Sequence, residues 1–266
     1  MELICPVCGG FLLKNDKTYT CAHGHSFDIA RQGYVNLLTV QQKHSLTPGD
    51  TREQVLSRRA FLEEGHYAPI DRTLIDQAQA LEITGPILDI GCGEGYYSTR
   101  LAEALGAELT GLDISKEAVR CAAAKYKNAL WLTATASHIP VADESVELLT
   151  SLFALTLPEE FHRVLAKDGL YFQVLAAQDH LLGLKSVIYP ELKLKEKDSV
   201  PELPGFERIK TVPIRFTFTV EGQQVQNLLS MTPHVYRISK EGAARLAATE
   251  KLTDTASAVL NVYKVV

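Results

Sequence analysis

A glycine-rich turn that follows a short apolar segment is the part of this chain best suited to chemistry. Residues 88–95 read Leu-Asp-Ile-Gly-Cys-Gly-Glu-Gly, with glycines at alternate positions. Glycine has no Cβ and tolerates a positive φ, so the backbone can turn sharply and a cofactor can lie against it. The spacing differs from the G-x-G-x-x-G that seats a pyrophosphate, and Asp89 would repel a phosphate. The set Asp89, Gly91, Gly93 and Gly95 therefore predicts a cofactor with a cationic, phosphate-free centre, such as S-adenosylmethionine.

A second carboxylate lies one predicted strand further along the chain. Residues 109–113 read Leu-Thr-Gly-Leu-Asp, an apolar strand that ends at Asp113. A carboxylate about twenty residues beyond the glycine turn is placed to accept both hydroxyls of a ribose. The series of strand, glycine turn, helix, strand and acid resembles the class I methyltransferase domain, which implies an α/β fold with a Rossmann-like sheet. A nicotinamide-binding fold or an inactive Rossmann-like domain is the alternative.

Three of the five cysteines crowd into the first 21 residues, which indicates a local metal site in a reducing compartment. Cys5-Pro-Val-Cys8 forms one knuckle and Cys21-Ala-His-Gly-His25 a second, with a hairpin expected between them that turns at residues 15–16. Two thiolates and a Cys/His pair supply the four ligands of a structural Zn²⁺ site. The fourth ligand is either His23 or His25 on spacing alone, and His25 is preferred. The alternative is a redox C-x-x-C, which normally opens a helix in a βαβ unit.

Composition limits the remaining classes of function. The chain has 266 residues, 46% hydrophobic residues and a net charge of −5, which suits one large domain plus a small one. It contains no apolar run long enough to cross a membrane and no secretory signal, so we expect a cytoplasmic protein without membrane partners. The charge does not favour nucleic-acid binding, but a local basic patch would suffice for it.

Taken together, the two halves resemble one family, the bacterial 23S ribosomal RNA (guanine-N1)-methyltransferases. The resemblance covers essentially the whole chain, and the joining of a zinc knuckle to a methyltransferase core is its most specific element. The stretches that carry it are residues 5–8, 21–28, 30–38, 48–50, 58–62, 65–67, 89–97, 113–119, 178–181 and 231–233.

The resemblance implies S-adenosylmethionine-dependent methyl transfer to N1 of one guanine in a 23S rRNA hairpin. It implies zinc ligation by Cys5, Cys8, Cys21 and His25, and it suggests a homodimer. The cofactor contacts that it implies are Tyr67, Gly93, Glu94 and His180.

The organisation expected along the chain has three parts. Residues 1–36 form a zinc ribbon that recognises RNA, 37–82 a linker with two helices (51–64 and 69–81), and 83–266 the methyltransferase domain. Strands and helices should alternate from 86 to 176, and two long strands at 206–219 and 255–265 should close the sheet. A lysine run at 193, 195 and 197 is read as a solvated face.

The sequence leaves the general base unidentified. Removal of the guanine N1 proton requires a carboxylate or histidine, or a group that stabilises the anion. Asp179 and His180 are the candidates, with Glu159 and Glu160 as further acids on nearby loops. Basic residues near the zinc module are expected to contact RNA phosphates: Arg31, Lys43, Arg52, Arg58 and Arg59.

Two other functions remain open. A small-molecule methyltransferase would share everything from residue 86 onward, but it has little reason to carry a zinc ribbon. A non-catalytic RNA-binding adaptor with a decayed cofactor pocket is the other, and the presence of Asp89, Asp113 and all three glycines speaks against it.

Overall fold

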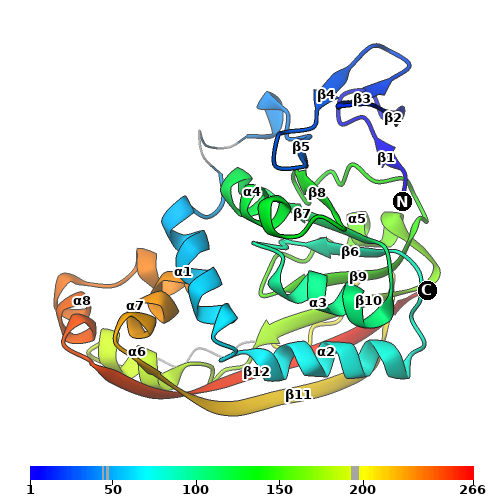
Figure 1. Ribbon diagram of the computed structural model, residues 1–266. Helices are drawn as coiled ribbons and strands as arrows, with labels where there is room; N and C mark the ends of the chain where they lie inside the picture. The colour runs from blue at the N-terminus through cyan, green and yellow to red at the C-terminus, as the bar shows by residue number, and fades with distance from the viewer. Residues whose placement is uncertain (44, 46–47, 193–197) are drawn as a thin grey trace.

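The computed structural model describes residues 1–266 except 44, 46–47 and 193–197. Within these residues the strands form two sheets, one of four strands in the order β1-β2-β3-β4 and one of eight in the order β11-β12-β10-β9-β6-β7-β8-β5. The first is the expected ribbon and the second is the expected Rossmann-like sheet (Figure 1). The predicted fold class is confirmed.

The small sheet is antiparallel and holds the cysteine knuckles. Its strands are β1 (Leu3–Ile4), β2 (Phe11–Asn15), β3 (Thr18–Cys21) and β4 (Ser26–Asp28). The hairpin between β2 and β3 turns at residues 16–17, one residue later than predicted, because Asn15 still pairs with Thr18. Asp16 takes the positive φ of 50° that this tight turn needs.

The large sheet is parallel in its centre and antiparallel at one edge. Its central strands are β6 (Ile87–Ile90), β7 (Leu109–Asp113), β8 (Leu130–Thr133), β9 (Val146–Leu152) and β10 (Leu165–Ala176). The long strands β11 (Phe206–Glu221) and β12 (Lys251–Val265) close the sheet beside β10, as predicted. The parallel order places the carboxyl ends of β6, β7 and β9 at one edge, where open α/β sheets bind ligands.

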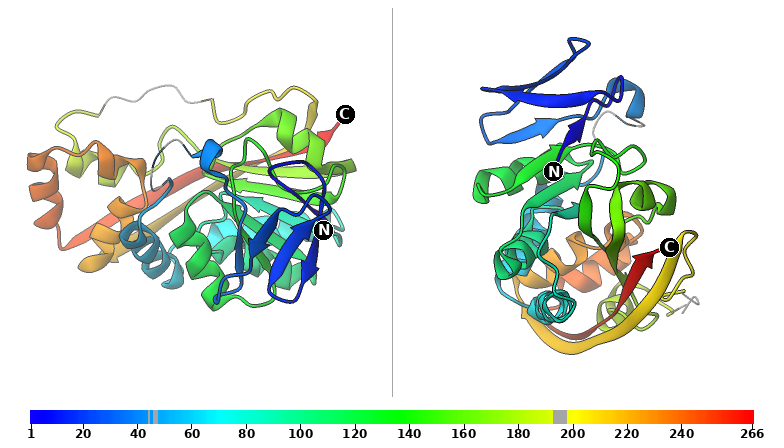
Figure 2. Two further views of the ribbon diagram at one scale, coloured as in Figure 1. Left: turned by 90° about the horizontal axis from the view of Figure 1, so that it is seen from above. Right: turned by 90° about the vertical axis from the view of Figure 1, so that its right-hand side faces the viewer.

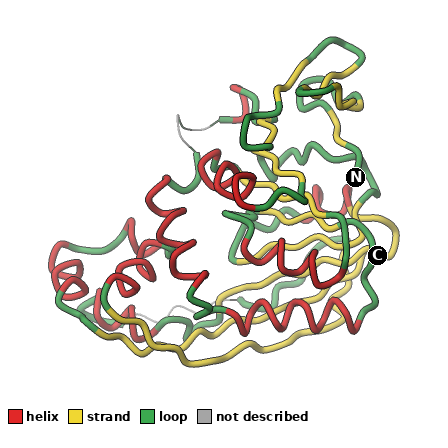
Figure 3. The backbone as a smooth tube through the Cα atoms, in the orientation of Figure 1, coloured by secondary structure: helices red, strands yellow, loops and turns green. Residues whose placement is uncertain are grey.

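Helices cover both faces of this sheet (Figure 3). Helices α2 (Ala68–Ala80), α3 (Tyr96–Leu105) and α4 (Lys116–Lys125) bury their apolar sides in one core, with Trp131 and Leu148 of the sheet. The short helix α5 (Pro158–Val164) packs on the other face in a second core that includes Phe161 and Tyr171. Helix α1 (Arg52–Glu63) lies across the carboxyl edge of the parallel strands (Figure 1).

The ribbon is joined to the large sheet by more than one connection. Strand β5 (Tyr34–Asn36), expected at the end of the ribbon, instead pairs in parallel with β8. Leu3 forms a bridge with Val141, and the backbone N–H of Ile4 donates to Pro140 O at 3.1 Å. The right-hand view of Figure 2 shows the small sheet standing at this end of the molecule. Residues 34–36 therefore belong to the methyltransferase sheet.

At the other end, β11 and β12 run past the central strands and carry a helical extension. It consists of α6 (Leu182–Ile188), α7 (Gln223–Ser230) and α8 (Lys240–Ala247), with a 3-10 turn at Pro233–Tyr236 between α7 and α8. Another 3-10 turn, Val40–Gln42, lies in the segment that follows β5. Figure 1 shows the three helices grouped beside α1. The sequence did not predict α7 and α8.

Two of the sequence predictions concern the surface of the molecule. The three lysines predicted to form a solvated face, at 193, 195 and 197, lie outside the described residues. Among the described helices, none combines the length and the apolar character that crossing a membrane requires.

Candidate cofactor site and zinc centre

The glycine turn adopts the conformation that its sequence demands. Gly91, Gly93 and Gly95 have φ values of 74°, 57° and 82°, a left-handed region that other residues adopt only under strain. The backbone N–H groups of Gly91 and Cys92 both donate to Leu112 O, at 2.8 and 3.1 Å. These bonds join the turn to the end of β7, so the turn and Asp113 form one structural unit.

An indole ring fills the space beneath this turn. A Cβ on Gly95 would lie 2.5 Å from Cη2 of Trp131, and one on Gly111 would lie 2.3 Å from its Cζ3. Trp131 is only 1% exposed, and its Nε1 donates to Tyr126 O at 2.9 Å. Gly95 is therefore required because any side chain there would clash with the indole. At Gly93 there is room for a ligand, since the nearest atom to a Cβ there is Arg58 Nη1 at 3.6 Å.

One buried and one partly buried carboxylate lie on either side of the turn. Asp89 is 3% exposed and accepts a hydrogen bond from Thr150 Oγ1 at 2.7 Å. Asp113 accepts the Gly93 N–H on Oδ2 at 2.9 Å and the Ser115 N–H on Oδ1 at 2.8 Å. Each carboxylate oxygen keeps a second lone pair for a ligand. The arrangement suits a ligand that brings a positive charge to Asp89 and hydroxyls to Asp113.

Burial makes these carboxylates sensitive to pH. It raises the pKa of Asp89 to about 6, against the opposing effect of the hydrogen bond from Thr150 and of the nearby Ser98 hydroxyl. Burial likewise raises the pKa of Glu94 and Asp113. A carboxylic acid whose pKa is raised must lose its proton before it can pair with a cation.

We therefore expect binding of S-adenosylmethionine to weaken on acidification. Because the cationic cofactor favours ionised Asp89, its dissociation constant should be flat above pH 7 and rise about tenfold per pH unit below pH 6. Calorimetric titrations from pH 5 to 8 in two buffers would also detect the proton released on binding. Asp89→Asn should bind weakly with a shallower pH dependence. A wild-type constant that is unchanged from pH 5 to 7 would contradict this assignment.

Tyr67 and His180, far apart in sequence, meet at this edge of the sheet. Tyr67 precedes α2, is 2% exposed and lies with its ring centroid 6.4 Å from that of His180. Phe61, Phe216 and Phe218 surround it, at centroid distances of 5.1 to 5.8 Å. Its buried Oη has no hydrogen-bond partner among the residues that the structure describes. A buried hydroxyl of this kind needs a partner, and a polar ligand atom would supply one.

The loop that carries His180 is held by β12. The N–H of Ser257 donates to His180 Nδ1 at 3.1 Å, and the N–H of Leu181 donates to Thr255 O at 3.0 Å. Asp254, buried in β12, accepts the N–H groups of Gly183 and Leu184 at 2.9 and 2.7 Å and so caps α6. Sequence reasoning missed Asp254, since the residues that it caps lie about 70 positions away.

These contacts restrict what the candidate bases can do. A backbone N–H can only donate, so His180 Nδ1 accepts, and in the neutral ring the hydrogen is on Nε2. A hydrogen bond with Ser257 and the ion pair with Arg215 lower the pKa of Asp179, which makes that carboxylate a weak base. Glu160 accepts from Ile139 N–H and pairs with Arg163 on α5, a structural role. Glu159 is exposed in the first turn of that helix.

Strained backbone flanks His180 on both sides. Among the described residues, Phe153 and Leu181 are the apolar side chains with a positive φ, at 54° and 56°. Phe153 follows β9, is 41% exposed, and its ring centroid lies 5.8 Å from that of His180. Its N–H donates to Val174 O at 2.9 Å, which holds the strained conformation. Bulky residues rarely adopt this region, and such strain gathers at functional sites.

The four predicted zinc ligands come together in the ribbon. The ligand atoms of Cys5, Cys8, Cys21 and His25 all lie within 4.8 Å of one another. Sγ of Cys8 lies 3.7 Å from that of Cys21, and His25 Nδ1 lies 3.5 and 3.3 Å from Sγ of Cys5 and Cys21. A tetrahedral Zn²⁺ site requires about 3.8 Å between sulfurs and about 3.5 Å between sulfur and nitrogen. The geometry thus fits zinc, and it favours His25 over His23.

The adjacent arginines predicted to contact RNA point in different directions. Arg59 pairs with Glu63 at 2.9 Å, and Glu63 also pairs with Lys125. Arg58 instead lies at the glycine turn, where a Cβ on Gly93 would be 3.6 Å from its Nη1. Arg58 therefore lies at the candidate cofactor site, which the sequence did not indicate.

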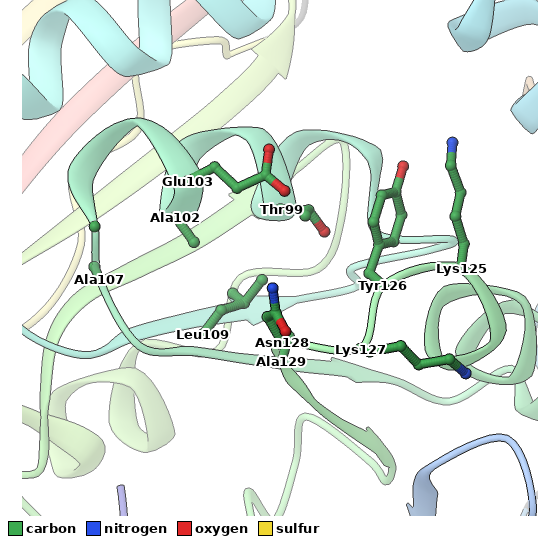
Figure 4. Close-up of a pocket in the computed structure, with 11 residues that line it drawn as sticks. Thr99, Ala102, Glu103, Ala107, Leu109, Lys125, Tyr126, Lys127, Asn128 and Ala129 are labelled. Carbon is green, nitrogen blue, oxygen red and sulfur yellow. The ribbon is translucent and has the colours of Figure 1, made fainter.

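A hollow of about 310 Å³ lies at the other edge of the sheet (Figure 4). Its walls are the ends of α3 and α4 and the starts of β7 and β8, with Thr99, Tyr126 and Leu109 among the lining residues. Because β7 runs from Leu109 to Asp113, this hollow is at the opposite end of the strand from the glycine turn. It is separate from the candidate cofactor site.

Comparison with known proteins agrees with both halves of the structure. Residues 3–46 match a zinc-ribbon family model described as RlmA, N-terminal, and residues 87–169 match a methyltransferase domain model. A Streptomyces fradiae protein named 23S rRNA (guanine(748)-N(1))-methyltransferase is 33% identical over 258 residues, which cover 92% of this chain and 90% of that protein. The chain belongs to the 23S rRNA (guanine-N1)-methyltransferase family. The protein is accordingly an S-adenosylmethionine-dependent methyltransferase with a zinc ribbon.

Other relatives support the same membership and fold. YxjB of Bacillus subtilis (strain 168), whose name carries the (guanine-N1) activity as a provisional assignment, is 28% identical over 91% of this chain and 89% of its own length. Phosphoethanolamine N-methyltransferase 2 of Haemonchus contortus, solved with S-adenosylhomocysteine, superposes with a TM-score of 0.50 at 15% identity, over 81% of this chain and 57% of that one. This last likeness shows the class I methyltransferase fold that the family shares.

Proposed function

We propose that this protein transfers a methyl group from S-adenosylmethionine to N1 of a guanine in a 23S rRNA hairpin. The observation that carries the proposal is the joining of a zinc ribbon to a complete glycine-turn site in one chain, with full-length similarity to a family member named for this reaction. We further propose that Cys5, Cys8, Cys21 and His25 hold the zinc and that the protein works in the cytoplasm.

For the cofactor, we propose that Asp89 and Glu94 face its cationic end and that Asp113 binds its ribose. Tyr67 and His180 enclose it from the side, and Gly91, Gly93 and Gly95 form the floor. The buried Tyr67 Oη and the opening above Gly93 support this placement. S-adenosylmethionine supplies an activated methyl group, so the chain's own residues mainly position the acceptor for in-line attack.

N1 lies on the Watson–Crick edge of guanine, so the base must be unpaired or extruded before it reacts. We propose that the extruded base stacks on Phe153, which is exposed beside His180 at the end of β9. As N1 loses its proton, negative charge develops on O6 of the base. The side chain of His180, which lies beside Phe153, is placed to stabilise this charge.

Phe153→Gly tests this acceptor platform. Glycine removes a backbone strain of about 1–3 kcal/mol, so the variant should be at least as stable as wild type in thermal unfolding. Loss of a stacked base contact should lower single-turnover methyl transfer to rRNA by about 10- to 100-fold. The cofactor dissociation constant should be unchanged, and Phe153→Tyr should keep the transfer rate. A destabilised Phe153→Gly variant with wild-type transfer would contradict both roles.

We propose that the zinc ribbon, up to the point where β5 enters the large sheet, positions the RNA. A hollow of about 610 Å³ beside the β2–β3 hairpin is lined by Lys14, Lys17 and Arg31, with Asp16 as the one acid among the lining residues. Closely spaced cations of this kind contact RNA phosphates without reading sequence. A homodimer that forms a cleft for the hairpin fits the family resemblance and remains part of the proposal.

The function is tested by methylation in vitro. We combine the purified protein with S-adenosylmethionine that carries a tritiated methyl group and with unmodified 23S rRNA transcript. The RNA is then digested to nucleosides, which are separated by chromatography and identified by mass spectrometry. We expect the label in 1-methylguanosine alone. Label in another nucleoside would reject the N1 assignment, and no transfer to RNA alongside transfer to extracted small molecules would favour the small-molecule alternative.

A further inference from the structure

Helix α1 brings a guanidinium to the one glycine of the turn that is open to a ligand. Arg58 lies on α1, whose first turn is fixed by a capping box between Thr51 and Gln54. From there its Nη1 reaches a point 3.6 Å from the Cβ position of Gly93. The guanidinium of Arg58 is therefore next to any cofactor that rests on the turn at Gly93.

The guanidinium is held in this place by a chain of contacts that begins at Asp113. Ser115 donates its N–H to Asp113 and its Oγ–H to Asp50 O at 2.7 Å, and Asp50 Oδ2 pairs with Arg58 Nη1 at 2.5 Å. Gly49 packs tightly on Ser115, since a Cβ there would lie 2.8 Å from Ser115 Cβ. The side chains of Arg58 and Asp50 are 25% and 29% exposed, so the pair is partly open to a ligand.

The charges around the turn restrict what Arg58 can bind. The nearby acids Asp89, Glu94 and Asp113 are suited to the cationic sulfonium and amine and to the ribose hydroxyls of the cofactor. The positive charge of Arg58 opposes the effect of burial on Glu94 and Asp113 by lowering the pKa of both. The carboxylate of the methionine moiety is the single anionic group of the cofactor, and a guanidinium fork matches a carboxylate.

We propose that Arg58 binds the methionine carboxylate of S-adenosylmethionine, with Asp50 holding the guanidinium over Gly93 before the cofactor arrives. Five N–H donors allow Arg58 to keep Asp50 on one side while it engages the ligand on another. Arg58 is thus a cofactor-binding residue that selects ligands with an amino-acid tail. The inference rests on the use of S-adenosylmethionine in the proposed function.

The test compares ligands with and without the carboxylate by calorimetry: S-adenosylmethionine, decarboxylated S-adenosylmethionine and 5′-methylthioadenosine. Each is titrated into wild type, Arg58→Met and Arg59→Met, the last being a matched control that removes the neighbouring arginine on the Glu63 side. We expect Arg58→Met to raise the dissociation constant of S-adenosylmethionine by about 10- to 100-fold, the range for loss of a hydrogen bond to a charged group. Binding of the two ligands without a carboxylate should change less than about threefold.

Two results would overturn the inference. One is equal weakening of all three ligands by Arg58→Met, which would mean that Arg58 acts only through Asp113 or the fold. The other is unchanged binding of S-adenosylmethionine. Arg58→Lys is a second variant that keeps the charge but loses the fork, and it should fall between wild type and Arg58→Met. If wild type binds none of the three ligands, the proposed function itself fails, which distinguishes the two failures.

Discussion

The His25→Ala variant is expected to lose its zinc and most of its methylation of rRNA, while His23→Ala keeps both. His25 Nδ1 lies 3.3 Å from Cys21 Sγ and completes the four-ligand cluster with Cys5 and Cys8. A structural zinc site in a small module contributes about 10–16 kcal/mol of binding free energy that is also folding free energy. Without it, the antiparallel strands of the ribbon have too little core of their own to stay folded.

Metal content by mass spectrometry and methyl transfer to 23S rRNA check this expectation. We expect less than one tenth of the wild-type zinc in His25→Ala and a loss of transfer of about 100-fold or more, as for loss of the metal from a module that depends on it. The affinity for S-adenosylmethionine should remain, since the glycine turn lies in the large sheet. Cys121→Ser, a cysteine on α4 outside the cluster, is the control for nonspecific damage. Full zinc in His25→Ala, or its loss in His23→Ala, would contradict the ligand set.

The Gly111→Ala variant is expected to destabilise the fold and, at the same time, to weaken the binding of S-adenosylmethionine. Gly111 pairs with Trp131 across β7 and β8, and an added Cβ would lie 2.3 and 2.5 Å from two indole carbons. It would also lie 3.1 Å from Sγ of Cys92 in the glycine turn. The indole cannot move aside, because it is buried and its Nε1 is hydrogen-bonded to Tyr126 O. Overpacking of this kind lowers the free energy of unfolding by about 1–3 kcal/mol.

A double-mutant cycle with Trp131→Leu separates this clash from a general intolerance of β7 to change. Trp131→Leu alone should destabilise the fold through the cavity it leaves, by less than the roughly 3–5 kcal/mol of a Trp→Ala change. Adding Gly111→Ala to it should then cost little, because the space is free, and the coupling should be at least about 1 kcal/mol in denaturant unfolding. Additive losses would show that the contact with Trp131 is not the cause.

The features that could be predicted from sequence are those whose parts lie close together along the chain. The zinc cluster is formed by residues within a span of 21 positions, so spacing and ligand chemistry indicated the three cysteines and a histidine, and left only the choice between His23 and His25. The glycine turn is likewise local, and the expected positive φ at Gly91, Gly93 and Gly95 is confirmed. The alternation of strands and helices from 87 to 176 followed from apolar runs bounded by caps and turns.

The features that could not be predicted depend on contacts between distant segments. Arg58 was read as an RNA contact because nothing local shows that α1 crosses the carboxyl edge of the sheet. Strand β5 looks like the end of the ribbon until β8 is seen beside it. The roles of Asp254 and Ser257 depend on β12 passing the His180 loop. Position along the chain suggests Asp179 as a base, whereas its partners Ser257 and Arg215, which lower the pKa of its carboxyl, make it a weak one.

Primer extension on 23S rRNA from cells with and without this gene tests the central claim most directly. A methyl group on N1 blocks base pairing, so reverse transcriptase stops at the modified guanine. We predict one stop that disappears on deletion of the gene, returns with the wild-type gene and does not return with Asp89→Ala. A pattern of stops that is unchanged by deletion would contradict methylation of 23S rRNA at guanine N1 by this protein.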